Sequence, residues 1–154
     1  MSALWHEAGA QKDGTMYRET AFREANSSIY QGPHIHVGNP IYKTPRANCN
    51  SNKAYDIIDI NNVPNDYTPR TNYGPSVDIS EFRRRITRCR WDHAKSHVDF
   101  FRMAFRGMIA LNGERSLIGA MIPRGVTHNN GVLSVAFKDE KNLINASAQY
   151  ISLP

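Results

Sequence analysis

Proline and glycine limit the helices that this chain can form. Residues 29–46 and 63–75 are both rich in proline, glycine and asparagine. The second stretch contains Pro64, Pro69 and Pro75. These exclude a helix there, because proline lacks the backbone N–H and its ring clashes with the preceding turn. The chain is therefore expected to form short elements joined by long, ordered loops.

Several short segments have the patterns of β-strands. In residues 34–37 two apolar residues alternate with two histidines between loop-forming residues, which predicts a short strand. Residues 55–60 are rich in isoleucine and end before an Asn-Asn pair, which also favours a strand. The apolar segments 116–122 and 131–137 are expected to form two further strands.

Helices are predicted in three places. Asp78 or Ser80 can cap a short basic helix over residues 81–86. Residues 98–110 have apolar side chains at helical spacing, and a last helix is expected over residues 139–150. The side chains assigned to helix packing are Phe100, Phe101, Phe105 and Met108. Together these patterns predict an α+β fold, with a small mixed or antiparallel sheet, two or three helices and long ordered loops.

The 154 residues suit one domain that needs no disulfide or metal to fold. Residues 1–28 are expected to be an irregular lead-in segment, and residues 29–154 to form the domain. The apolar end of the sequence suggests a fragment of a longer chain. Cys49 and Cys89 have no CxxC spacing, which favours a reducing cytoplasm. With no run of about 20 apolar residues and no signal sequence, a soluble cytoplasmic protein is expected.

The chain is basic, with 19 Lys and Arg against 14 Asp and Glu and a net charge of +5. Arginine is the commoner cation, which suits planar, bidentate partners such as phosphate or guanine. The run Arg83, Arg84 and Arg85 can neutralise DNA phosphates, contacts that position a protein without reading sequence. The same run is also typical of a solvated basic face, so charge supports a functional reading without establishing it.

A polar turn follows one of the expected strands. The apolar residues 118–122 end at a proline, and the turn after it carries Arg124, His128, Asn129 and Asn130. Arginine pairs well with guanine and asparagine with adenine at the edges of bases. These four residues are therefore the first candidates for base contacts.

The two proline-rich loops supply further candidates. Lys43 and Arg46 lie in the first loop, and Arg70 and Asn72 in the second. Prolines stiffen such loops and lower the cost of ordering them on binding. We therefore expect these four side chains to contact bases as well.

The sequence patterns that would indicate an enzyme are weaker than those for nucleic-acid binding. Residues 39–42 read Asn-Pro-Ile-Tyr, close to the motif with which adenine methyltransferases hold a flipped base, but no glycine-rich cofactor loop accompanies them. A structural turn is favoured there. His34 and His36 would share one face of a strand, as His93 and His97 would on a helix, so a small metal-dependent enzyme is one alternative. A basic protein-interaction domain is another. No catalytic residue, metal ligand or cofactor is assigned within the chain.

Several segments together resemble one family. Residues 114–118 read Glu-Arg-Ser-Leu-Ile and lead into the turn over 122–129, while residues 101–106 read Phe-Arg-Met-Ala-Phe-Arg. With residues 30–34 and 69–73, this order resembles the target-recognition region of large bacterial DNA adenine methyltransferases. These include the type IIG restriction-modification enzymes and related phage-defence methylases. Residue 116 is a serine where the family commonly has threonine.

The resemblance implies a module that reads duplex DNA for a catalytic domain lying upstream in the same parent chain. It implies sequence-specific binding of double-stranded DNA, with no membrane partner. The parent would use S-adenosylmethionine as its cofactor and can be fused to a nuclease. Regions that read DNA diverge most where they touch bases, so the target sequence does not follow from the resemblance.

Overall fold

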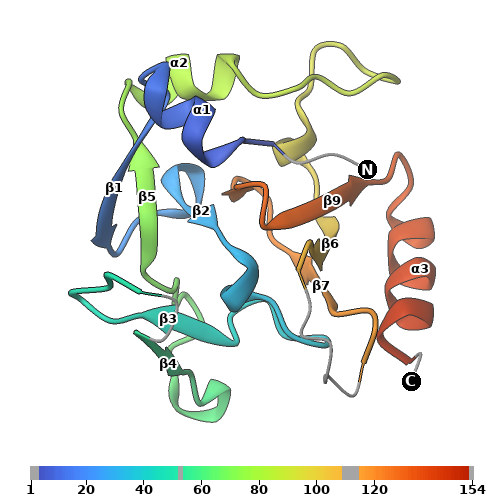
Figure 1. Ribbon diagram of the computed structural model, residues 1–154. Coiled ribbons are helices and arrows are strands. Elements are labelled where there is room, and N and C mark those ends of the chain that lie inside the picture. The colour runs from blue at the N-terminus through green and yellow to red at the C-terminus, as the bar shows by residue number, and fades with distance from the viewer. Residues whose placement is uncertain (1–3, 52–53, 109–114, 153–154) are drawn as a thin grey trace.

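A computed structural model describes residues 4–51, 54–108 and 115–152 of the chain. Within these residues the fold is α+β, with small sheets, short 3₁₀ turns and three α-helices (Figure 1). The predicted fold class is confirmed. None of the described helices is long and apolar enough to cross a membrane.

The largest sheet has three antiparallel strands in the order β7-β6-β9. They are β7 (Gly119–Ile122), β6 (Arg102–Arg106) and β9 (Val132–Ala136). Helix α3 (Glu140–Ser152) covers one face of this sheet, on the right in Figure 1. The buried residues at this contact are Met103, Phe105 and Leu143. Burial of these apolar side chains attaches the C-terminal helix to the sheet.

A second antiparallel pair lies on the other side of the molecule, where β1 (Met16–Ala21) pairs with β5 (Thr71–Pro75) (Figure 1). Helices α1 (Glu7–Lys12) and α2 (Ile79–Arg84) adjoin it. Their apolar faces share one buried cluster. Its members are Trp5, Ala10, Met16, Ile29, Tyr73, Phe82, Ile86 and Val98. The N-terminal helix is therefore part of the domain core.

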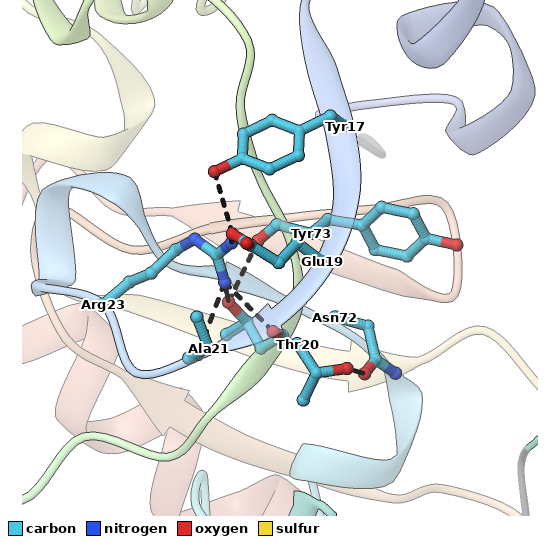
Figure 2. A network of polar contacts seen from close by, with 8 residues as sticks. Tyr17, Glu19, Thr20, Ala21, Arg23, Asn72 and Tyr73 are labelled. Carbon is cyan, nitrogen blue, oxygen red and sulfur yellow. Dashed lines mark hydrogen bonds and ion pairs between the residues drawn. The ribbon is translucent and has the colours of Figure 1, made fainter. Parts of the chain in front are cut away.

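The Arg23 side chain connects β1 to β5 by hydrogen bonds (Figure 2). Its Nη1 donates to the carbonyl oxygens of Ala21, at 3.3 Å, and Thr71, at 3.1 Å. Its Nη2 pairs with Glu19 at 3.1 Å. A Cβ atom at Gly74 would lie 2.4 Å from the Arg23 Nε. The absence of a side chain at Gly74 therefore lets the guanidinium lie against β5.

Two smaller pairs complete the architecture. The parallel pair β2 (Ile29–Tyr30) and β8 (Thr127–His128) connects the two larger sheets. The antiparallel pair β3 (Lys43–Pro45) and β4 (Tyr55–Ile57) forms an arm at the lower left of Figure 1. The 3₁₀ turns are Ala25–Ser27, Gly32–His34, Ile60–Asn62 and His97–Asp99. The first proline-rich stretch is largely ordered loop, as expected, whereas residues 71–75 of the second stretch form strand β5.

The prediction of a helix over residues 98–110 is wrong for the residues that the structure describes. The chain there forms a 3₁₀ turn and then strand β6, and residues 109–110 lie outside the described part. Phe101 and Met108, assigned to helix packing, are 40% and 76% exposed. Strand β6 has neighbours on both edges and is buried on both faces, so its sequence lacks the alternation that identifies a half-exposed strand.

Of the other secondary-structure predictions, some are confirmed and some are wrong. Asp78 caps α2 by accepting from the backbone N–H groups of Ser80 and Glu81, and both predicted C-terminal strands and the last helix are present. The first 28 residues, expected to be irregular, contain α1 and β1. No strand forms at residues 34–37, where His36 makes only an isolated bridge with Asn39. The strand expected over 55–60 ends at residue 57.

Gly119 tests the packing of the central sheet. A Cβ atom there would lie 2.7 Å from the Phe105 ring and 2.8 Å from the Met103 methyl group. Gly119→Ala is therefore expected to lower the free energy of unfolding by about 1 to 3 kcal/mol through overpacking, measured by urea denaturation. Gly9→Ala is the matched control, since its Cβ would find ordinary contact distances in α1 and should raise stability slightly. Equal stability of Gly119→Ala and the original chain would contradict this packing.

Candidate functional site

One hollow of about 550 Å³ lies where α1, β1, β3, β5 and the segment after β8 meet. We call it the polar pocket. Its charged and amide side chains include Glu7, Arg18, Gln31, Lys43, Asn72 and Arg106. Its volume lies within the range of about 300 to 1,000 Å³ that is usual for small-ligand sites.

The Glu7 carboxylate joins two walls of the polar pocket. One oxygen accepts a short hydrogen bond from the Tyr73 hydroxyl, and the other accepts from the Asn129 amide at 2.9 Å. The Glu7 backbone N–H also donates to the Asn130 side chain at 3.1 Å. Burial, and then the bond to Glu7, raises the pKa of Tyr73. Tyr73 therefore remains a protonated donor at neutral pH.

A second network forms around Asn72. Its Nδ2 donates to the Tyr55 hydroxyl at 2.8 Å and to the Gln31 Oε1 at 3.0 Å. The Tyr55 hydroxyl donates in turn to the same Gln31 oxygen at 3.0 Å. The Asn72 Oδ1 accepts from Thr20 at 2.8 Å, the contact drawn in Figure 2. Burial raises the pKa of Tyr55. These bonds hold the amide and phenol groups in fixed orientations.

The charges around the polar pocket are unbalanced. Arg18, Lys43 and Arg106 line it with one carboxylate, that of Glu7. None of the three cations takes part in an ion pair within the described part of the chain. The Arg106 Nε is buried and has no hydrogen-bond partner there. Because buried donors are normally satisfied, this arrangement suits an anionic ligand.

The polar pocket gathers half of the residues expected to contact bases. Lys43, Asn72 and the pair Asn129-Asn130 come from three separate segments of the chain and line this one hollow. Asn72 and Asn129 are buried in its walls, whereas Asn130 is exposed. The sequence patterns identified the four as separate candidates, and only the tertiary fold brings them together.

Other residues of the polar pocket carried no signal in the sequence. Glu7 and Arg18 lie in the segment expected to be irregular, and Tyr55 begins a strand with no functional motif. Arg106 lies within the segment expected to be a helix and is the last residue of strand β6. The pairing of β1 with β5 brings Arg18 opposite Tyr73. A prediction of that pairing would have been needed to find them.

Three of the remaining base-contact candidates lie elsewhere. Arg124 is exposed, pairs with Glu140 at 2.5 Å and lies over the Phe101 ring. Arg46 pairs with Asp56 at 2.8 Å. Half-buried Arg70 donates to the carbonyl oxygen of residue 45 at 3.1 Å. The structure therefore does not bring these arginines into the polar pocket.

His128 is fully buried, so its side chain does not face a ligand in this conformation. Its Nε2 lies 2.7 Å from the Ser134 hydroxyl, and its Nδ1 lies 3.1 Å from the Asn129 carbonyl oxygen. Burial, and then the charge of Arg102, lowers the pKa of His128 to about 3. The ring is therefore neutral at physiological pH. The turn predicted to present His128 to bases places it in the core.

The three predicted phosphate contacts lie on and just after α2. Arg83 pairs with Asp99 at 2.6 Å, while Arg84 and Arg85 both pair with Glu81. Surface pairs of this kind contribute only about 0 to 1 kcal/mol, so a phosphate can compete for the arginines. The segment that follows adds exposed cations and an aromatic ring. They are Arg88, Arg90, Lys95 and Trp91.

His34 and the Asn-Pro segment have structural roles. The buried His34 accepts from the Gln31 backbone N–H at its Nδ1, and its Nε2 lies 2.9 Å from the Arg70 carbonyl oxygen. Both ring nitrogens are thereby occupied. The Asn39 Oδ1 accepts from the Ile41 N–H at 2.9 Å and closes a turn. Among the described residues there is no group of three or more His, Cys, Asp or Glu able to hold a metal ion.

The chain was also compared with known proteins. Neither a protein-family model nor a curated protein nor a solved structure matches it. The functional argument therefore depends on the residues and geometry described above.

The buried His128 gives a test by pH. Its folded pKa of about 3 lies below the ordinary value of 6.5, so the unfolded chain binds more protons once the pH falls below 6.5. Stability is therefore present above that pH and is lost on acidification, by about 1 kcal/mol from this group between pH 7 and 5.5. His128→Gln should flatten the dependence of unfolding free energy on pH in this window. An unchanged slope would show that His128 titrates normally.

Proposed function

We propose that this chain binds duplex DNA in a sequence-specific manner. It would act as the target-recognition region of a bacterial DNA adenine methyltransferase of the restriction-modification or phage-defence kind. The observation that carries the proposal is the polar pocket, in which residues expected from sequence to contact bases meet cations without ion pairs. The resemblance of the sequence segments to that family supports the same reading.

The side chains divide into two kinds of DNA contact. Base reading needs donors and acceptors that a base edge can reach, and the exposed amide of Asn130 supplies them at the polar pocket. Phosphate contacts need cations alone, and the arginines on and after α2 supply these on the surface. Such a division is usual in proteins that read DNA, since phosphate contacts position the protein and base contacts specify the site.

The catalytic step belongs to a separate domain in this proposal. S-adenosylmethionine carries a sulfonium cation, which would meet Arg18, Lys43 and Arg106 in the polar pocket. Like charges repel, so these three cations do not fit the sulfonium group of that cofactor. We propose that the upstream domain of the parent chain binds it, while the residues described here hold and read DNA.

The direct test is selection from a pool of random duplex DNA at near-physiological salt, followed by sequencing of the retained fraction. An enriched motif is expected, with affinity that falls as salt rises because counterions are released from neutralised phosphates. Retention without an enriched motif would contradict sequence-specific reading. No retention even at low salt would contradict DNA binding by this chain.

Arg84 tests the phosphate contacts. Its side chain is 76% exposed beside Glu81, so Arg84→Gln should leave the fold intact. Loss of one phosphate contact should weaken binding to all sequences and reduce the slope of log affinity against log salt by about 0.9, measured by fluorescence anisotropy. Lys141→Gln, a cation of α3 outside the proposed contacts, should leave the slope unchanged. An equal effect of the two changes would indicate general charge attraction.

A further inference from the structure

The shape of the polar pocket limits what can enter it. Bases within a duplex present only their edges, and proteins read them with side chains that protrude into a groove. Asn72, Tyr73 and Asn129 do not protrude, because they are buried in the walls of a hollow of about 550 Å³. A ligand must therefore enter the pocket to meet them. A single nucleotide can do so, whereas a stacked base pair cannot.

The charge of the polar pocket indicates which part of a nucleotide is attracted most strongly. Arg18, Lys43 and Arg106 face one carboxylate, and that carboxylate already accepts hydrogen bonds from Tyr73 and Asn129. The buried Arg106 Nε has no partner in the described part of the chain. A phosphate group provides the anionic oxygens that an arginine binds with charge-assisted hydrogen bonds.

Another part of the lining suits the polar edge of a base. Gln31, Tyr55 and Asn72 form a connected set of amide and phenol groups. Hydrogen bonds from such groups read the Watson–Crick edge of a base that has left the stack. Tyr42 also lines the hollow, and the Lys43 Nζ lies 5.1 Å from the centroid of its ring.

We propose that the polar pocket receives one unstacked nucleotide, with its phosphate at Arg106 and its base toward Tyr55 and Asn72. This inference rests on the proposed DNA binding, and it adds that one base of the bound duplex leaves the stack. Unstacking costs a few kcal/mol and costs least at a mismatched pair. The pocket should therefore prefer duplexes in which a mismatch weakens the pair that opens.

The experiment uses 2-aminopurine, a base analogue whose fluorescence rises when it leaves the stack. It is placed in turn at each position of a duplex retained by the chain. We expect a several-fold rise at one position on binding. Arg106→Gln removes no hydrogen bond that the described residues make through Nε, and should weaken binding about tenfold. Tyr55→Phe should reduce the fluorescence rise, and Lys141→Gln should change neither quantity. Thermal unfolding of each variant checks its fold.

The outcomes separate this inference from the proposed function. Duplex binding with no fluorescence rise at any position would overturn the unstacked nucleotide and leave DNA recognition intact. A second arm measures binding of free deoxynucleoside 5′-monophosphates by calorimetry. Binding that Arg106→Gln weakens, without duplex binding, would identify a free nucleotide as the source of the same chemistry and contradict the proposed function. Binding of neither ligand, or binding insensitive to Arg106→Gln and Tyr55→Phe, would overturn the pocket assignment.

Discussion

The Glu7 carboxylate holds together parts of the chain that are far apart in sequence. It accepts from Tyr73 on β5 and from Asn129 after β8, while its own backbone N–H donates to Asn130. The neighbouring Trp5 forms a parallel bridge to Asn129. Polar groups in a partly buried network are held firmly, because breaking one bond leaves another group unsatisfied. The N-terminal helix therefore fixes the spacing of two walls of the polar pocket.

The buried Arg102 of strand β6 explains why His128 of the polar turn lies in the core. Arg102 donates to the Val126 carbonyl oxygen and lies 3.4 Å from the Ser134 hydroxyl. Burial lowers its pKa to about 10, so it stays charged at neutral pH. A charged guanidinium in the core needs polar neighbours. The uncharged ring of His128 is one of these neighbours. Part of the polar turn thus serves the core, while Asn130 remains at the polar pocket.

Local sequence signals are sufficient to predict some elements of the fold. The Asp78 cap, the final helix and the proline-rich loops follow from chemistry within a few residues. Apolar side chains at helical spacing over residues 98–110 favour a helix, and strand β6 within them lacks the alternation of a half-exposed strand because both of its faces are buried. The N-terminal pairing was missed because β1 meets β5 more than fifty residues later in the chain. Neither error could be corrected from residues near the element.

The same limit applies to the candidate site. Lys43, Asn72, Asn129 and Asn130 have side chains suited to nucleic acid, so their residue types and loop positions marked them individually. Their convergence depends on the contact between Glu7 and Asn129, which are separated by 122 positions. No spacing rule covers such a distance. Sequence therefore identifies the chemistry of these side chains, and tertiary contacts decide which of them act together.

The hydrogen-bond networks and the unpaired cations have different consequences for binding. Gln31, Tyr55 and Asn72 are already hydrogen-bonded to one another, so the wall that they form is rigid before a ligand arrives. Rigid walls reduce the ordering cost of binding and reject ligands whose donors and acceptors do not match. The guanidinium of Arg106, with its unsatisfied Nε, instead gains most from an anion whatever the base attached to it. Selectivity should therefore come from the amide and phenol groups, and affinity from the cations that line the same pocket.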